Sequence, residues 1–168
     1  QFLTFFASQV DQIDRVRIYS PDPYLHTMFR NPDSGENRAH DGSIHEIGRR
    51  TMGNMIRLFD VAGYFAVQTH ACAPVSRPFT LALALTDSFL DQNNRTFWLR
   101  IEGESVQLMP EGTADVTLWA DISDFSSLVI GAIPLADFVR LGRIRLSDPA
   151  YLRDIQRAIG WDVKPCNY

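Results

Sequence analysis

The chain has 168 residues, of which 45% are apolar, and its formal net charge is −4. This composition fits one well-buried core, and it argues against a broad nucleic-acid surface, because such a surface needs clustered Lys and Arg. No apolar run reaches the ~18 to 20 residues of a membrane-spanning helix, and the first ten residues lack the features of a signal peptide, so we expect a cytoplasmic protein.

The first 53 residues do not contain enough elements for a domain. Apolar residues recur at helical spacing over residues 2–13, and residues 14–19 alternate as in a half-buried strand. Asp22 and Pro23 then start a short helix that runs through Phe29. Residues 31–53 turn polar and show no periodicity, which is typical of a linker. We interpret residues 1–53 as the end of an upstream domain followed by a linker, and we expect the chain to be a fragment.

A sheet is predicted after the linker. The pattern favours a strand over residues 55–59 and a short helix over residues 61–69. Three further strands and one hairpin turn follow from alternating apolar residues and a polar break: strands 79–85, 96–101 and 105–108, with the turn at residues 102–104. Residues 115–120 make a fifth strand.

Helices with clear start and stop signals come next. Ser123 is predicted to cap a helix that ends at Gly131, and Pro134 opens a second one that ends at Gly142. Asp148 and Pro149 begin a third helix, which runs to about Ile159. Residues 144 and 146 alternate with arginines, as in a brief edge strand. Residues 54–168 are thus predicted to form an α/β (α+β) domain, with a mainly antiparallel sheet of about five strands covered by helices.

Four short runs carry a resemblance to a known family. They are residues 55–61, 114–118, 128–131 and 141–144, in this order over roughly a hundred residues. The chain resembles the C-terminal, sterol-carrier-like domain of the enhanced intracellular survival family of GNAT acetyltransferases. The resemblance implies a sterol-carrier-protein-like fold for residues 54–168. It also implies that residues 1–53 hold the partial helix-strand-helix end of the second, non-catalytic GNAT-like domain.

The resemblance also implies a function for the longer protein. In that family the acetyl-CoA site lies in the first GNAT-like unit and the protein assembles into hexamers. We therefore expect no cofactor on this chain, acetyl-CoA and an amine substrate in the full-length protein, a homo-oligomer, and no activity from this chain alone. Residues 50–55 come close to the family's cofactor loop, but Met55 fills a position that must be small, so we interpret the match as chance.

The last residue is a candidate catalytic group by the same resemblance. In family members the carboxylate of the terminal residue, usually aromatic, helps to remove a proton from the substrate amine. Tyr168 ends this chain and is aromatic, so its carboxylate is the corresponding group here. A frayed tail without a function is the alternative.

A set of large apolar residues marks the strands and the helices that pack over them: Phe97, Trp98, Leu118, Trp119, Phe125, Leu128, Leu135 and Phe138. In a sterol-carrier-like fold some of these would line a tunnel for a lipid or fatty acyl ligand. A chain of this size also needs such residues for its core, and we favour that interpretation. A lipid-binding module and a pure assembly domain remain as alternatives to the acetyltransferase hypothesis.

Other chemistry is weakly signalled. The four histidines do not fall at metal-ligand spacing, and Cys72 and Cys166 stand far apart, so no metal site is expected. Asp121 and Asp124 resemble a pair of acid/base carboxylates, but helix initiation explains them more simply.

Overall fold

The structure, a computed structural model, describes residues 55–160 continuously and scattered residues between 4 and 20. The chain divides into two units, and residues 52–167 form the second of them. The fold below is that of the second unit by itself. The elements predicted over residues 2–29, the linker and the last eight residues fall almost wholly outside the described residues and stay predictions.

One sheet of five strands organises this unit. The strands are β1 (Phe79–Thr86), β2 (Thr96–Glu102), β3 (Ser105–Met109), β4 (Val116–Asp121) and β5 (Arg145–Leu146). Their order across the sheet is β3-β2-β1-β4-β5. β1 and β4 are parallel, and the other three neighbouring pairs are antiparallel. The mainly antiparallel sheet predicted from the sequence is therefore confirmed.

The sequence of β1 shows why this sheet has a core side and an outer side. Side chains alternate between the two faces of a strand. Phe79, Leu81, Leu83 and Leu85 are buried in the core cluster, and the residues between them are one threonine and two alanines. The large residues of β1 therefore face the helices and build the core, whereas its small residues point to the opposite face of the sheet.

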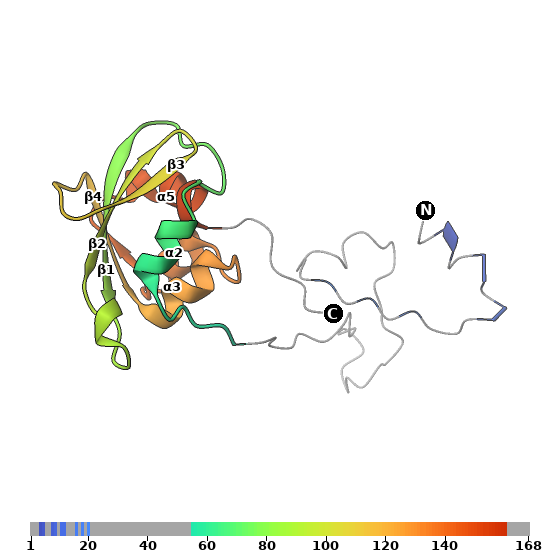
Figure 1. Cartoon of the computed structure of the whole chain (residues 1–168). Coiled ribbons are helices and arrows are strands. Elements are labelled where there is room, and N and C mark those ends of the chain that lie inside the picture. Colours follow the sequence, from blue (N-terminus) through green and yellow to red (C-terminus); the bar gives the residue numbers. More distant parts are fainter. Residues whose placement is uncertain are drawn as a thin grey trace. The chain divides into compact units, whose positions relative to one another are not determined.

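Four helices and two single turns complete the described part of this unit, residues 55–160. The helices are α2 (Val61–Val67), α3 (Ile122–Val129), α4 (Leu135–Arg140) and α5 (Leu152–Ile159), and the 3₁₀ turns are η2 (Asp91–Asn93) and η3 (Pro149–Tyr151). Figure 1 shows α2, α3 and α5 on the same side of the sheet. None of the helices in the described part of the chain is long and apolar enough to cross a membrane.

Helix ends follow the sequence signals, with one correction. Asp121, and not Ser123, caps α3, because the Asp121 carboxylate accepts a hydrogen bond of 2.8 Å from the Ser123 backbone N–H. Asp148 caps η3 in the same way through the Ala150 N–H, at 2.8 Å. A carboxylate offers two acceptor oxygens to the free N–H groups of a first turn, so it competes well with a nearby serine.

The strand predicted over residues 55–59 is wrong. These residues have no strand partner, and Met55, Ile56 and Phe59 are exposed. The fifth strand is instead the short β5, which pairs with β4 through Leu118–Leu146 and Trp119–Arg145. Residues 55–60, here called the lead-in segment, run to the start of α2 and are held by side-chain contacts described below.

Candidate functional site

Six of the eight predicted pocket residues lie in the packed interior between the sheet and the helices. They are at most 3% exposed and belong to one core cluster: Phe97, Leu118, Phe125, Leu128, Leu135 and Phe138. Interiors of this kind are close-packed. Five of the six are fully buried, and Phe97 also borders a surface hollow described below. These six residues belong to the hydrophobic core, and their role as the lining of a ligand tunnel stays a prediction.

Trp98 and Trp119 lie on the other face of the sheet. Trp98 is opposite Ala82 and Trp119 is opposite Ala84, so both project to the side that the alanines of β1 share. Trp119 is 36% exposed, and the guanidinium of Arg145 lies 4.4 Å from its ring centroid. The eight predicted residues are thus divided between two faces and do not form one pocket.

Two shallow surface hollows lie near these tryptophans. The first has a volume of about 530 Å³ and is lined by Arg95, Thr96, Phe97, Trp98, Leu108, Met109 and Pro110. The second has a volume of about 380 Å³ and lies where the parallel strands β1 and β4 end; Trp119, Asp121, Arg143 and Arg145 are among its lining residues. Both are open to the surface, unlike a lipid tunnel.

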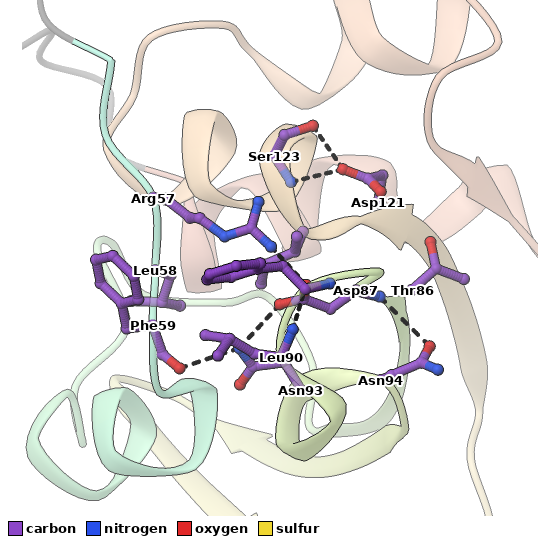
Figure 2. A network of polar contacts seen from close by, with 12 residues as sticks. Arg57, Leu58, Phe59, Thr86, Asp87, Leu90, Asn93, Asn94, Asp121 and Ser123 are labelled. Atoms are coloured by element: carbon purple, nitrogen blue, oxygen red, sulfur yellow. Dashed lines mark hydrogen bonds and ion pairs between the residues drawn. The ribbon is translucent and has the colours of Figure 1, made fainter.

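The most connected polar group of the described residues is Asp87, which directly follows β1 (Figure 2). Its carboxylate is buried and accepts hydrogen bonds from the backbone N–H groups of Phe89 (2.9 Å) and Leu90 (3.0 Å). The Asn93 amide donates to it at 3.1 Å, and the Arg57 guanidinium forms an ion pair with it. Asp87 therefore joins the turn after β1 to the lead-in segment.

Asn93 extends this network. Its amide nitrogen also donates to the carbonyl of Phe59 at 3.0 Å, and its amide oxygen accepts from the N–H of Val61 at 3.2 Å. A little further back, the N–H of Leu58 donates to the Ser126 hydroxyl at 3.0 Å. Side chains thus satisfy backbone groups of the lead-in segment that a strand partner would otherwise take. They fix this segment against the turn after β1 and against α3.

The network explains the ionisation of Asp87. Burial by itself would raise the pKa of this carboxyl, but the Phe89 and Leu90 N–H groups, the Asn93 amide and the Arg57 charge outweigh it. They hold the pKa of Asp87 below its usual value of 3.8. The patterns in the sequence do not single out this group. An Asp at the end of an apolar strand, followed by a polar Asp91-Gln92-Asn93 run, was the available signal.

Asp121 and Asp124, the other acidic candidates, do not form a catalytic pair. Asp121 is exposed and engaged as a cap, whereas Asp124 is buried and held by the guanidinium of Arg143 through two N–H groups, one of them at 3.1 Å. Within residues 55–160 no group of three or more His, Cys, Asp or Glu side chains is arranged to hold a metal ion. Tyr168 and residues 50–54 of the loop resembling a cofactor motif lie outside the described residues.

The mixed sheet with its helices on one face defines an α/β domain of the sterol-carrier architecture. Residues 66–168 match the family profile of the sterol carrier protein domain, so the chain belongs to this family. No curated protein sequence matches the chain.

Solved structures share the same fold. A protein from Enterococcus faecalis V583 described as a probable N-acyltransferase has a TM-score of 0.52 and 17% identity over 64% of this chain and 26% of its own. A GCN5-related N-acetyltransferase from Kribbella flavida gives 0.52 and 19%, over 64% and 27% of the two chains. One from Anabaena variabilis gives 0.51 and 17%, over 64% and 26%. This chain spans about a quarter of the length of these proteins.

Proposed function

We propose that this chain is the C-terminal part of a GNAT-type N-acetyltransferase that acts on amines with acetyl-CoA. In this proposal the sterol-carrier domain supports a catalytic unit and its substrate pocket, and it has no activity by itself. The likeness in fold to three longer proteins, two of them described as N-acetyltransferases, supports it. We further propose that the full protein is a cytoplasmic homo-oligomer, as in the enhanced intracellular survival family that the sequence resembles.

The packing of the interior is the main evidence that the sterol-carrier domain supports a catalytic unit. The residues that would line a lipid tunnel fill the interior, with Phe125, Leu128 and Phe138 fully buried. A filled interior gives a stiff domain, because close-packed side chains resist deformation. The lead-in segment is held to that domain by Arg57, Leu58 and Asn93. Stiffness and a fixed lead-in are the properties needed to hold a neighbouring catalytic unit in place.

Tyr168 has a specific role in this proposal. Its terminal carboxylate would reach the catalytic unit and take a proton from the substrate amine, which makes the amine a nucleophile. Extending the terminus by one glycine moves the carboxylate away from that position while it leaves the domain intact. We expect the extended full-length protein to lose about a hundredfold or more in kcat, which is the range of general-base catalysis. The variant Tyr168→Phe keeps the carboxylate and should retain activity.

The proposal is tested by comparing this chain with its complete gene product. The complete product should transfer acetyl groups from acetyl-CoA to amines, and this chain alone should show no turnover. Acetyl-CoA turnover by this chain alone would overturn the proposal. A complete gene product no longer than 168 residues would also overturn it, because no catalytic unit would then exist.

A lipid-carrying module is the second candidate, and membership of the sterol carrier protein domain family favours it. The filled interior argues against it. A domain that serves only in assembly is a third hypothesis, favoured by the exposure of Met109 and Trp119 on the sheet face without helices. Light scattering on the purified chain separates a monomer from an assembly.

A further inference from the structure

A stretch of β2 has a free edge. β3 ends at Met109, which pairs with Trp98, so Thr96 and Phe97 have no β3 residue opposite them. Pro110 follows Met109 and has no backbone N–H, so it cannot continue the ladder. Within residues 55–160, the first residues of β2 are therefore bonded to β1 on one side only.

The backbone of Thr96 points to this free edge. Residues of an antiparallel strand direct their N–H and C=O groups alternately to the two sides. The carbonyl of Arg95 accepts a hydrogen bond of 3.1 Å from the N–H of Leu85, so Arg95 faces β1. The N–H and C=O of Thr96 consequently point away from β1, into the hollow of about 530 Å³ at the end of β3.

The walls of this hollow come from both faces of the sheet. Arg95, Phe97 and Leu108 bound it on the core side, and Thr96, Trp98 and Met109 bound it on the outer side. An added strand sends alternate side chains to both faces, so it would contact both walls. A hollow of this kind, centred on a free strand edge, can thus accommodate one extended segment as an added strand.

The positive charge of Arg95 indicates which kind of segment would bind in the hollow. Arg95 is exposed, and its guanidinium lies 4.7 Å from the Phe97 ring centroid. Among the described residues no carboxylate lies within ion-pair distance of Arg95. A carboxylate on the incoming strand would form an ion pair with Arg95. Apolar side chains of the same strand would cover Trp98 and Met109 on the outer face of the sheet.

We propose that the free edge of β2 at Thr96 binds an extended segment of a partner protein, with acidic and apolar residues in alternation, by strand addition. A second copy of this chain fits less well. A two-fold pair through Thr96 would bring the Arg95 residues of the two copies to diagonal positions about 7 to 8 Å apart, where like charges repel. The proposal does not depend on the acetyltransferase function.

Fluorescence anisotropy with two labelled hexapeptides tests the proposal. One peptide alternates valine and glutamate, and the other alternates valine and lysine. We expect the chain to bind the glutamate peptide at least about tenfold more tightly, because a hydrogen bond to a charged partner contributes that much. Arg95→Glu should reverse this preference.

Two variants at Thr96 separate the backbone from the side chain. Thr96→Pro removes an N–H that β1 does not use, so the fold should persist by circular dichroism and binding should be lost. Thr96→Val keeps the N–H and should bind as the wild type does. Binding of both peptides alike, or of neither, would overturn the proposal. Self-association of the chain that is abolished by Thr96→Pro would show that a second copy is the occupant and would overturn it too.

Discussion

The guanidinium of Arg57 pairs with the buried carboxylate of Asp87, two residues separated by 30 positions in the sequence. This ion pair joins the lead-in segment to the turn after β1. The Arg57 guanidinium also lies 5.7 Å from the Phe89 ring centroid, so the same side chain packs against the turn that supplies the N–H donors of the Asp87 carboxylate. Loss of the charge on Asp87 should therefore loosen both segments together.

Asp87→Asn should lower the stability of the domain. The substituted amide has fewer acceptor sites and directs an N–H group toward donors, so at least one of the Phe89, Leu90, Asn93 and Arg57 groups loses its partner. Urea unfolding followed by tryptophan fluorescence measures the loss. Asp91→Asn is the matched control, because Asp91 is exposed and nearby, and it should change the free energy of unfolding by no more than about 0.5 kcal/mol. Equal stability of the two variants would contradict this role of Asp87.

The same carboxylate should make stability depend on pH. Its folded pKa lies below the unfolded value near 3.8, so its stabilising contribution is complete above about pH 5 and is lost as the pH falls through the folded pKa. The difference in the free energy of unfolding between the wild type and Asp87→Asn should shrink between pH 6 and pH 3. Carboxylates common to both proteins cancel in this difference. A difference that stays constant with pH would show that the charge of Asp87 does not stabilise the fold.

Neighbouring residues of β4 should respond differently to truncation. Leu118 is fully buried, so Leu118→Ala should cost ~2 to 5 kcal/mol through lost contacts and a cavity. Trp119→Ala removes a partly exposed ring that stacks with Arg145, and about 1 kcal/mol is expected. Chemical denaturation of both variants makes the comparison. A smaller effect at Leu118 would mean that its side chain lines an open space.

Gly142 should resist replacement because of its backbone. Its φ is +70°, and it follows α4 in a Schellman motif, in which Gly142 N–H donates to Val139 C=O and Arg143 N–H donates to Phe138 C=O, both at 3.0 Å. Gly142→Ala should cost about 1 to 2 kcal/mol from the left-handed conformation alone, since no atom lies within 4 Å of the added methyl group. Thermal unfolding measures the effect.

Gly112→Ala is the control for this prediction. A methyl group at Gly112 would meet Trp98 at 3.8 Å, an ordinary contact, and the backbone there is not left-handed. The expected change is within about 0.5 kcal/mol. If both alanine variants were equally stable, the positive φ of Gly142 would carry no strain penalty.

Much of the fold could be predicted because single strands and helices have local signals. β1 alternates large and small residues, and Asp148-Pro149 marks a helix start that the structure confirms. The prediction of a strand over residues 55–59, in the lead-in segment, was wrong for a physical reason. Its apolar residues resemble a strand, yet its backbone bonds to the side chains of Ser126 and Asn93, which are remote in sequence. No local pattern reveals such partners.

The candidate site was less predictable. The sequence indicates which residues face the interior. Whether Phe125 and Leu128 line an open tunnel or pack against other core side chains depends on how closely α3 packs on the sheet. That spacing is a property of the whole core. The Asp87 network was missed for a similar reason, since its charged partner, Arg57, lies 30 positions away in the sequence.

Native mass spectrometry of the purified chain tests most directly whether the interior is filled. Because Leu118, Phe125, Leu128 and Phe138 are fully buried in one cluster, we predict the mass of the bare polypeptide, with no added mass after incubation with a fatty acid. A co-purified lipid, or stoichiometric uptake of the fatty acid, would contradict the supporting role and establish a carrier.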